Sequence, residues 1–253
     1  SFIAIDQKGQ FLYAVNEIDN YDENSSGAIS VYELIKGSGK LNLIQQVSSL
    51  GAHPAHVSID KSGKYLLAAN YTSGNISVFP IDKDGRLGEH TALIQNYGSS
   101  INPERQTSPH AHFIQVSNDN RFVMVADLGI DKILIFQFDS ATGSLKPNEP
   151  AYINLSPGSG PRHFAFTPSG KFLYVLNELT STVTIFDFDQ ATASSKSKQT
   201  ISTLPENFEG TNTAAEILVD SRGKFLYASN RGDNSIVQFS INPVSGMLTP
   251  VKW

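Results

Sequence analysis

The chain has 253 residues, of which 40% are hydrophobic, 19 are Lys or Arg and 24 are Asp or Glu, so the formal net charge is −5. This hydrophobic content suits a packed globular core, and the scattered basic residues argue against a nucleic-acid partner, because binding to a phosphate backbone needs several Lys or Arg side chains acting together. The chain has no cysteine, which excludes disulfides, Cys-bound zinc and thiol nucleophiles.

No stretch approaches the roughly 18 consecutive apolar residues that a membrane span needs, so we expect no membrane partner. The start, SFIAIDQKGQ, has neither the basic nor the apolar region of a signal peptide. The sequence therefore favours a cytoplasmic protein, with the periplasm or secretion as alternatives if an N-terminal segment precedes Ser1. It gives no indication of the oligomeric state.

Along the chain, one unit occurs five times. Each copy opens with two alternating apolar runs joined by a polar turn, and the copies are 1–17, 55–71, 112–128, 162–178 and 215–231. The turn positions, 50 to 57 residues apart, are Gly9, Gly63, Asn120, Gly170 and Gly223. Gly and Asn most readily adopt the positive φ of a tight hairpin. We therefore predict a β-hairpin in every copy.

Two further segments follow each hairpin. The third segment alternates clearly, at 28–34, 75–81, 132–138, 182–188 and 235–241. A weaker fourth segment follows a Gly-rich or polar turn, as in SGKLNLIQQVS. The Ser- and Lys-rich ATASSKSKQT (191–200) is interpreted as a loop between the outer strands of the fourth repeat. This pattern predicts four antiparallel strands in each unit and no helix.

A four-stranded meander cannot bury both of its faces alone, so repeats of this kind pack face to face around an axis as the blades of a β-propeller. We predict an all-β fold, a single β-propeller domain over 1–253 with five visible blades. The repeats are about 1–50, 51–107, 108–157, 158–210 and 211–253. The Gly-His and Trp-Asp signatures of WD40 blades are absent, so that subclass is not expected.

The first strand of a propeller blade lines the channel, so the start of the first strand and the end of the second lie at one rim. The residues eight positions before the turn are Ser1, Ala55, His112, Arg162 and Ala215. Those eight positions after it are Glu17, Tyr71, Leu128, Glu178 and Arg231. Arg162 and Glu178 should be cross-strand neighbours, because Gly170 lies midway between them. Charged groups that converge on a concave site suit catalysis or anion binding, although each charge alone could simply be solvated.

Two more sets of residues follow from the same count. A second ring next to the first contains Phe2, His56, Phe113, His163 and Glu216. The turn residues fall at the opposite rim and are interpreted as solvent-exposed, namely Asp60, Lys64, Lys171 and Lys224.

The segment SPHAHF contains a His-x-His pair, His110 and His112. Their spacing puts both on one side if the strand has already begun. Such a pair can bind zinc, but the sequence fixes no further ligand beside it, so no metal site is predicted. A neutral imidazole near an arginine and a glutamate is a better candidate for acid–base chemistry.

Several longer motifs are similar to those of the seven-bladed lactonase propellers. The motifs are the strand–SGK[FY]LY–strand–Asn unit, SPHAHF with VADLGIDKILIF, GPRHFAFTPSGKFLYVLNE and SNRGDNSI. This family includes one class of bacterial 6-phosphogluconolactonase and the fungal 3-carboxymuconate lactonizing enzymes. The resemblance covers essentially the whole chain.

The resemblance implies a metal-free and cofactor-free site of one His, two Arg and one Glu. By motif, these catalytic residues fall on His112, Arg162, Glu178 and Arg231, with His110 as the alternative match for the histidine. Further substrate-binding residues are expected at His110, His163, Glu17 and Tyr71. Family members carry two more repeats, so we expect the chain to be part of a seven-bladed protein and to lack two blades.

The implied activity is hydrolysis of an anionic sugar-acid lactone, of the kind that a 6-phosphogluconolactonase carries out. One arginine would polarise the lactone carbonyl, water activated by His112 or Glu178 would attack it, and the other arginine would hold the anionic group. Two alternatives remain open, of which the first uses the same residues. The protein could be a muconate-type lactonizing enzyme (cycloisomerase), or a non-catalytic propeller that binds a carbohydrate, peptide or surface partner through its rim.

Overall fold

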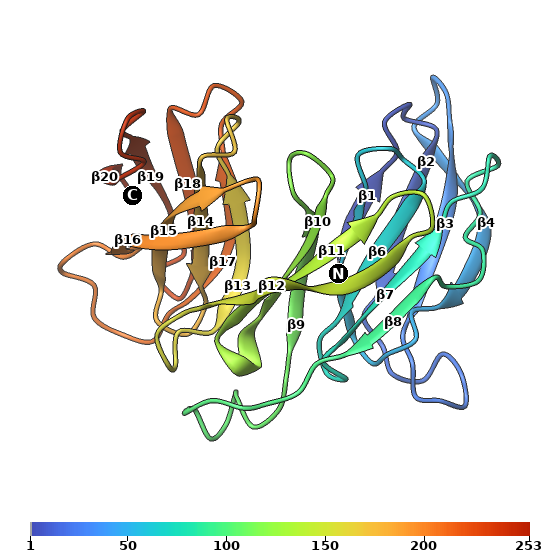
Figure 1. Cartoon of the computed structure of the whole chain (residues 1–253), viewed down its shortest axis with the longest axis horizontal. Helices are drawn as coiled ribbons and strands as arrows, with labels where there is room; N and C mark the ends of the chain where they lie inside the picture. The colour runs from blue at the N-terminus through green and yellow to red at the C-terminus, as the bar shows by residue number, and fades with distance from the viewer. Residues whose placement is uncertain (1) are drawn as a thin grey trace.

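The five repeats fold into five four-stranded antiparallel sheets in the computed structural model, and the sheets follow one another in chain order (Figure 1). The structure describes residues 2–253, so Ser1 of the expected ring lies outside the described residues. The first sheet consists of β1 (Ile3–Ile5), β2 (Phe11–Asn16), β3 (Ala28–Ile35) and β4 (Lys40–Ser48). The second consists of β5 (Pro54–Ile59), β6 (Tyr65–Asn70), β7 (Asn75–Pro80) and β8 (Ala92–Gln95).

The remaining three sheets repeat this order. The third contains β9 (Ala111–Val116), β10 (Phe122–Asp127), β11 (Lys132–Asp139) and β12 (Ser144–Asn154). The fourth contains β13 (Pro161–Phe166), β14 (Phe172–Asn177), β15 (Thr182–Asp189) and β16 (Ser194–Ser202). The fifth contains β17 (Thr213–Val219), β18 (Phe225–Arg231), β19 (Ile236–Ile241) and β20 (Leu248–Lys252).

The expected unit of four strands is confirmed in every repeat. The third segments coincide with β3, β7, β11, β15 and β19 to within one residue at either end. The five turn residues all have positive φ, between 63° and 71°. The helical element of the described chain is one short 3₁₀ turn, η1 (Leu128–Ile130), which follows β10. A helix long and apolar enough to span a membrane does not occur between residues 2 and 253.

The interpretation of 191–200 as a loop is wrong, because β16 runs from Ser194 to Ser202 and pairs with β15. The segment lacks an apolar alternation because an outer strand has no further strand on one side and is largely exposed. Lys196 and Lys198 lie on it, and charged side chains on an edge strand also discourage pairing with other chains. A hydrophobic pattern in the sequence is therefore a poor predictor of edge strands of this kind.

The hydrophobic core lies between successive sheets, where each apolar cluster joins side chains from two neighbouring sheets. Between the first two sheets, for example, Ile29 and Val31 pack with Leu66 and Phe79. Burial of each large apolar side chain contributes about 1.5–3 kcal/mol. The first strands of neighbouring sheets also contact one another, β1 with β5, β5 with β9, β9 with β13 and β13 with β17. These strands therefore line a common axis, as the propeller prediction requires.

Buried tyrosines link the first sheet to the second and the fourth sheet to the fifth. The Tyr13 hydroxyl of β2 donates to the Gly85 carbonyl of the second sheet at 2.9 Å. The Tyr174 hydroxyl of β14 makes the corresponding bond to Gly246 of the fifth sheet, also at 2.9 Å. Burial raises the pKa of both phenols, which keeps them neutral donors. The second strand, which leads to the rim, is thereby held in a defined position.

The register of the hairpins shows a feature that the sequence did not reveal. A β-bulge interrupts the pairing of the first two strands near the open end of the hairpin in the second to fifth sheets. In the third sheet Ala111 and Phe113 have strand partners and His112 between them has none. In the fourth, Pro161 pairs with Asn177 and His163 pairs with Leu176, which leaves Arg162 unpaired.

Arg162 and Glu178 are neighbours across the hairpin, as expected, and their side chains form an ion pair, but the bulge takes up one residue of β13 and removes Arg162 from the ladder. Ala55 occupies the bulge of the second sheet, and Ala215 and Glu216 occupy that of the fifth. A bulged residue is released from the ladder and its side chain is re-aimed, which is why bulges are common beside active sites.

The opposite rim holds the hairpin turns. Lys64, Lys171 and Lys224 are exposed there, as expected. The same expectation for Asp60 is wrong, because only 1% of this residue is exposed. Its carboxylate accepts the backbone amides of Lys64 and Tyr65 at 2.8 and 2.9 Å. Asp60 is thus part of the turn structure and not of the solvated surface.

Candidate active site

The open ends of the hairpins surround a cavity of about 610 Å³. The expected site residues that line it are Glu17, Tyr71, His112, Arg162, His163, Glu178 and Arg231. The cavity is completed by Phe2, Ala55, Arg105, Ala215 and Glu216. His112 and Arg162 enter it from bulges, and Glu178 and Arg231 enter it from the ends of second strands. The spacing of the repeat therefore identified most of one concave, polar site.

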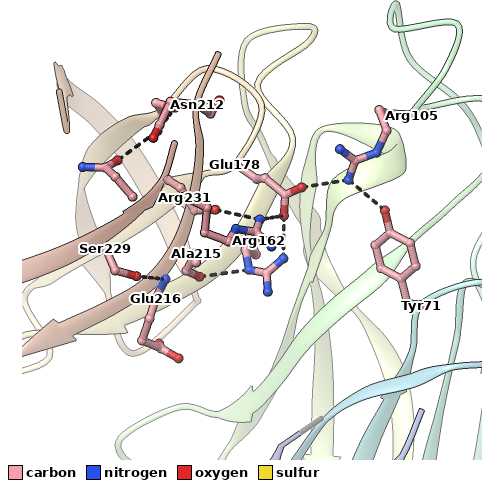
Figure 2. Close-up of polar contacts among 12 residues, drawn as sticks. Tyr71, Arg105, Arg162, Glu178, Asn212, Ala215, Glu216, Ser229 and Arg231 are labelled. Atoms are coloured by element: carbon pink, nitrogen blue, oxygen red, sulfur yellow. Dashed lines mark hydrogen bonds and ion pairs between the residues drawn. The ribbon is translucent and has the colours of Figure 1, made fainter. Parts of the chain in front are cut away.

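Glu178 is the centre of the charged cluster, and its side chain is only 3% exposed. Its Oε2 atom accepts Nη1 of Arg162 at 2.5 Å and lies 3.0 Å from Nη2 of Arg231. Its Oε1 atom accepts Nη2 of Arg105 at 2.7 Å. Figure 2 shows the three guanidinium groups around this carboxylate, with Arg105 on one side and Arg162 and Arg231 on the other.

The protonation state of Glu178 follows from these contacts. Burial alone would raise the pKa of this carboxyl, but Arg162, Arg105 and Arg231 outweigh burial and lower the pKa below its ordinary value. Both oxygens are also occupied by guanidinium groups. Glu178 is therefore ionised at neutral pH, with both of its oxygens occupied by arginines.

Backbone carbonyls of the fifth sheet fix two of these arginines further. Nε of Arg162 donates to the Ala215 carbonyl at 3.0 Å, and Nη2 of Arg231 donates to the Ala214 carbonyl at 3.3 Å. The bulge takes the Ala215 carbonyl out of strand pairing, so that its oxygen can accept the hydrogen bond from Arg162. The Arg162 side chain is 18% exposed and that of Arg231 is 48% exposed. Arg162 is thus the deeper of the two cations.

His112 is the neutral group of the cluster, and 8% of the residue is exposed. Burial, followed by the charge of Arg162, lowers its pKa well below the ordinary value of 6.5. Its Nδ1 atom is buried and has no hydrogen-bond partner in the described part of the chain. An unpaired buried polar atom is uncommon in a folded protein and marks a place where a ligand or water can bind. At neutral pH this imidazole can accept a proton.

His163 belongs to a second layer of rings behind His112. Its Nδ1 atom lies 2.9 Å from Oε1 of Glu216, and its ring lies 5.2 Å from that of His112 and 4.7 Å from that of Phe113. His56 contacts Phe113 in turn, at 4.1 Å between ring centres. Burial lowers the pKa of His163, although Glu216 opposes the shift. The expected second ring therefore exists as an aromatic layer across the channel.

His110 lies outside the set of residues that line the cavity. Its ring stacks on that of Tyr71, with 4.5 Å between centres and 13° between planes. Its Nδ1 atom is 3.0 Å from the Tyr71 carbonyl, and its backbone amide donates to Asp127 at 2.7 Å. Of the two histidines that the sequence left open, His112 is the one that reaches the cavity.

Arg105 was not among the expected site residues. It lies in the connection between β8 and β9, outside the segments on which the repeats were aligned. One signal was present in the sequence, because the spacing from Gly63 to Asn120 is the largest between successive turns and marks extra residues. That spacing indicates an insertion but does not tell where the insertion folds.

Within residues 2–253, no group of three or more His, Cys, Asp or Glu side chains is arranged to hold a metal ion. The site can therefore be described from its own side chains. A neutral imidazole, a buried carboxylate and several guanidinium groups face one cavity. This set can bind an anion, polarise a carbonyl group and accept a proton.

Comparison with known proteins points to one family. The family model described as "Lactonase, 7-bladed beta-propeller" matches residues 1–253. The chain is 31% identical over 252 residues to the 6-phosphogluconolactonase of Bacillus subtilis, covering 100% of this chain and 69% of the relative. It is 34% identical over 251 residues to the 6-phosphogluconolactonase of Formosa agariphila, covering 98% and 69%.

Solved structures agree with this. The periplasmic gluconolactonase of Pseudomonas aeruginosa superposes with a TM-score of 0.91 at 32% identity, covering 100% of this chain and 71% of that protein. A Bacteroides fragilis protein superposes with a TM-score of 0.89 at 33% identity, covering 100% and 70%. The chain thus spans about 70% of the length of the proteins to which it is similar.

Proposed function

Because the chain belongs to the lactonase family of seven-bladed β-propellers, we propose that it hydrolyses a sugar-acid lactone of the 6-phosphogluconolactone type. The observation that supports this best is the meeting of a neutral His112 with arginines held by Glu178 at one cavity. The muconate-type and the non-catalytic alternatives are not favoured, since relatives carry the name 6-phosphogluconolactonase.

His112 is proposed as the general base. Its lowered pKa leaves the imidazole neutral at physiological pH, and the residue lines the cavity in which a lactone would bind. The oxygen of a water molecule forms a bond to the carbonyl carbon of the lactone while a proton passes from that water to His112. General base catalysis of this kind typically contributes about 10²- to 10⁴-fold to the rate.

Arg162 is proposed to stabilise the oxyanion. It is the less exposed of the two catalytic arginines expected from the sequence, and the partly excluded water strengthens its electrostatic effect. When the tetrahedral intermediate collapses, the carbonyl re-forms and the bond to the ring oxygen breaks. The ring oxygen then takes up the proton from His112, which gives the open-chain hydroxy acid and regenerates the neutral imidazole.

For Glu178 we propose a role other than the activation of water that the sequence left open for it. Its lowered pKa and its three arginine partners make it unsuited to activating water. We assign it to holding the guanidinium groups in place, so that they do not need to reorganise when charge develops on the substrate. Preorganised charge of this kind is usually the largest electrostatic contribution to catalysis.

The test is hydrolysis of 6-phosphogluconolactone above its spontaneous rate, with His112→Ala and Arg162→Ala as variants. We expect a decrease in kcat of about 10²- to 10⁴-fold for His112→Ala and of about 10²- to 10³-fold for Arg162→Ala. The matched controls are His90→Ala and Arg86→Ala, which change residues outside the cavity lining. A wild-type protein with no rate above the spontaneous one would contradict the proposal.

The five sheets are also proposed to form part of a seven-bladed ring. The first sheet carries exposed Ile3, Ile5, Leu41 and Leu43, and the fifth carries exposed Leu218 and Ile236. These apolar side chains lie on the two sheets that have only one neighbouring sheet among the described residues. Further blades would cover them in the way that the inner sheets cover one another. A protein with two more repeats should unfold at a clearly higher temperature than residues 1–253 alone.

A further inference from the structure

Arg105 lies in the longest connection between sheets. Residues 96–110 join β8 to β9, whereas the other connections between sheets cover only 49–53, 155–160 and 203–212. Long connections without regular structure in a compact fold are usually functional. This one runs to the mouth of the channel, where Arg105 lines the cavity.

The connection is held in one conformation by the turn that follows β10. Asp127 accepts Nδ2 of Asn96 at 2.8 Å and the amide of His110 at 2.7 Å, which fixes both ends of the segment. In the middle, Gln106 is fully buried and donates to the Leu128 carbonyl at 2.8 Å. Ser100 donates to Asp131 at 2.5 Å. Arg105 is therefore presented by an anchored segment, directly next to the buried Gln106.

The contact between this segment and η1 leaves no room for a side chain at Gly129. A Cβ atom there would lie 1.9 Å from the Ser108 carbonyl oxygen. The two backbones thus touch directly, and the segment cannot move towards the turn. This packing adds to the hydrogen bonds in defining the position of Arg105.

Among residues 2–253, the guanidinium group of Arg105 donates through one of its nitrogens. Nη2 donates to Glu178 Oε1 at 2.7 Å and to the Tyr71 hydroxyl at 3.2 Å (Figure 2). Nε and Nη1 have no hydrogen-bond partner in residues 2–253, and the side chain remains 38% exposed. An arginine that is oriented at one nitrogen and open at the others is suited to bind a carboxylate or phosphate bidentately.

The local charge around Glu178 favours an anion. Three guanidinium groups share this one carboxylate, so positive charge is concentrated around Glu178. The other two acids of the lining are Glu216, whose Oε1 lies 2.9 Å from Nδ1 of His163, and Glu17, which follows β2 of the first sheet. The anionic group of a substrate could accept from the open nitrogens of Arg105 in this positively charged cluster.

We propose that Arg105 binds the anionic substituent of the lactone and so determines selectivity for phosphorylated over neutral sugar lactones. This inference rests on the proposed lactonase function, and it assigns to Arg105 direct contact with the substrate and to Tyr71 the orientation of Arg105. His112 and Arg162 would then act on the lactone ring, while the 96–110 segment holds the other end of the molecule.

The experiment compares Arg105→Ala and Arg105→Gln with the wild type on 6-phosphogluconolactone and on neutral glucono-δ-lactone. We expect KM for the phosphorylated lactone to rise about tenfold to a hundredfold, because a hydrogen bond to a charged group is lost, while kcat changes little. For the neutral lactone, kcat/KM should change less than about threefold. Arg105→Gln keeps a hydrogen-bond donor beside Glu178 and separates loss of charge from loss of structure.

The matched control is Arg121→Ala. Arg121 also pairs with an acid, Asp119, and also donates to a backbone carbonyl, but it lies outside the cavity lining. A tyrosine variant, Tyr71→Phe, should raise KM for the phosphorylated lactone by a smaller factor than Arg105→Ala. Thermal unfolding of every variant checks that the fold is kept.

The outcomes separate this inference from the proposed function. An equal loss of kcat/KM on both lactones in Arg105→Ala would overturn the inference and leave lactonase activity intact. If the wild type hydrolyses neither lactone, the proposed function fails, and binding of 6-phosphogluconate measured by calorimetry still decides on Arg105. Binding that Arg105→Ala weakens at least tenfold would support an anion site, and unchanged or absent binding would overturn it.

Discussion

The two rims of the propeller differ in which structural feature recurs from blade to blade. At the turn rim, the side chain three residues before each turn residue accepts the amide five residues after itself, and this holds for Asp6, Asp60, Ser117, Thr167 and Asp220. At the channel mouth, the bulge in the backbone repeats, but the bulged side chains differ and include Ala55, His112, Arg162 and Ala215.

This difference indicates that the turn rim serves folding and that the channel mouth serves function. A polar cap at every turn satisfies backbone amides that the hairpin leaves unpaired, so its chemistry must be the same in each blade. A bulged residue has no ladder partner, so its side chain can change from blade to blade without loss of pairing. Substitutions at the turn rim should therefore change stability alone, and substitutions at the mouth should change activity.

The largest effect is expected at Glu178. Glu178→Ala leaves three guanidinium groups together in a partly buried site without their counter-charge. Removing one partner of a buried ion pair costs about 3–5 kcal/mol, and we expect the free energy of unfolding in urea to fall by this amount. Activity should fall at least about a hundredfold, because the arginines lose their positions.

The control for Glu178→Ala is Glu89→Ala, which removes an exposed acid outside the cavity lining. A loss below about 1 kcal/mol for Glu178→Ala would mean that the carboxylate is not a buried anchor. Glu178→Gln should fall between the wild type and Glu178→Ala in stability, since the amide keeps the volume and one acceptor.

A smaller effect, on stability alone, is expected at Asp60 of the turn rim. Asp60→Ala removes the acceptor of the Lys64 and Tyr65 amides and of Nδ2 of Asn120 in the next sheet. Unsatisfied buried donors cost about 1–3 kcal/mol each, and partial access of water should limit the total to about 2–3 kcal/mol. The midpoint of urea unfolding should decrease while kcat stays within twofold of the wild type.

Lys64→Ala is the control for Asp60, because the neighbouring lysine is exposed and should change stability by less than about 0.5 kcal/mol. A decrease in kcat for Asp60→Ala as large as the one expected for His112→Ala would break the separation between the rims. Both variants can be measured on the same lactone substrate.

The hairpins and their turns could be predicted from the sequence because the requirement is local. Positive φ at the turn forces Gly or Asn, and the alternation of apolar residues fixes which strands follow. Counting from the turn then brought His112, Arg162, Glu178 and Arg231 to one rim, where they line one cavity.

The bulges and Arg105 could not be predicted, because both depend on contacts distant in the sequence. A bulge shifts the register by one residue without changing the composition, so Arg162 was expected opposite Glu178. Arg105 reaches the site through Asp127, Gln106 and Leu128, which no repeat pattern connects. The burial of Asp60, by contrast, depends on local contacts. An Asp before a Ser-Gly turn is a recognisable cap for the backbone amides of the turn, so not every turn carboxylate is exposed.

The enzymatic rate should depend on pH through the histidines at the channel mouth. Burial and, for His112, the charge of Arg162 hold the pKa values of His112 and His163 below 6.5. The neutral base therefore persists as pH falls, and the enzymatic rate above background should stay constant from pH 8 down to 6.5 and decline only below it. The decline should approach about tenfold per pH unit beyond the inflection.

The free energy of unfolding should depend on pH through the same two histidines. Below pH 6.5 the unfolded chain takes up protons on these histidines that the folded chain does not, so the free energy of unfolding decreases as pH falls. The titration of the His112 ring can be followed by NMR, with a histidine-containing peptide as the reference. An inflection of the His112 signal above 6.5 would contradict the neutral imidazole on which the proposed base depends.

The smallest effect is expected at Gly63, in the turn of the second sheet. Its φ is +71°, and a Cβ atom there would meet no other atom within 4 Å, so Gly63→Ala introduces backbone strain without a clash. Such strain costs about 1–2 kcal/mol, and thermal unfolding should show it with no change in kcat or KM.

Gly85→Ala provides the contrast, because its Cβ would lie 2.3 Å from the ring of Phe11 in the first sheet. It should therefore cost clearly more than Gly63→Ala. Equal costs would mean that the sheets yield at this contact, and a change in kcat for Gly63→Ala would mean that the turn rim is coupled to the mouth after all.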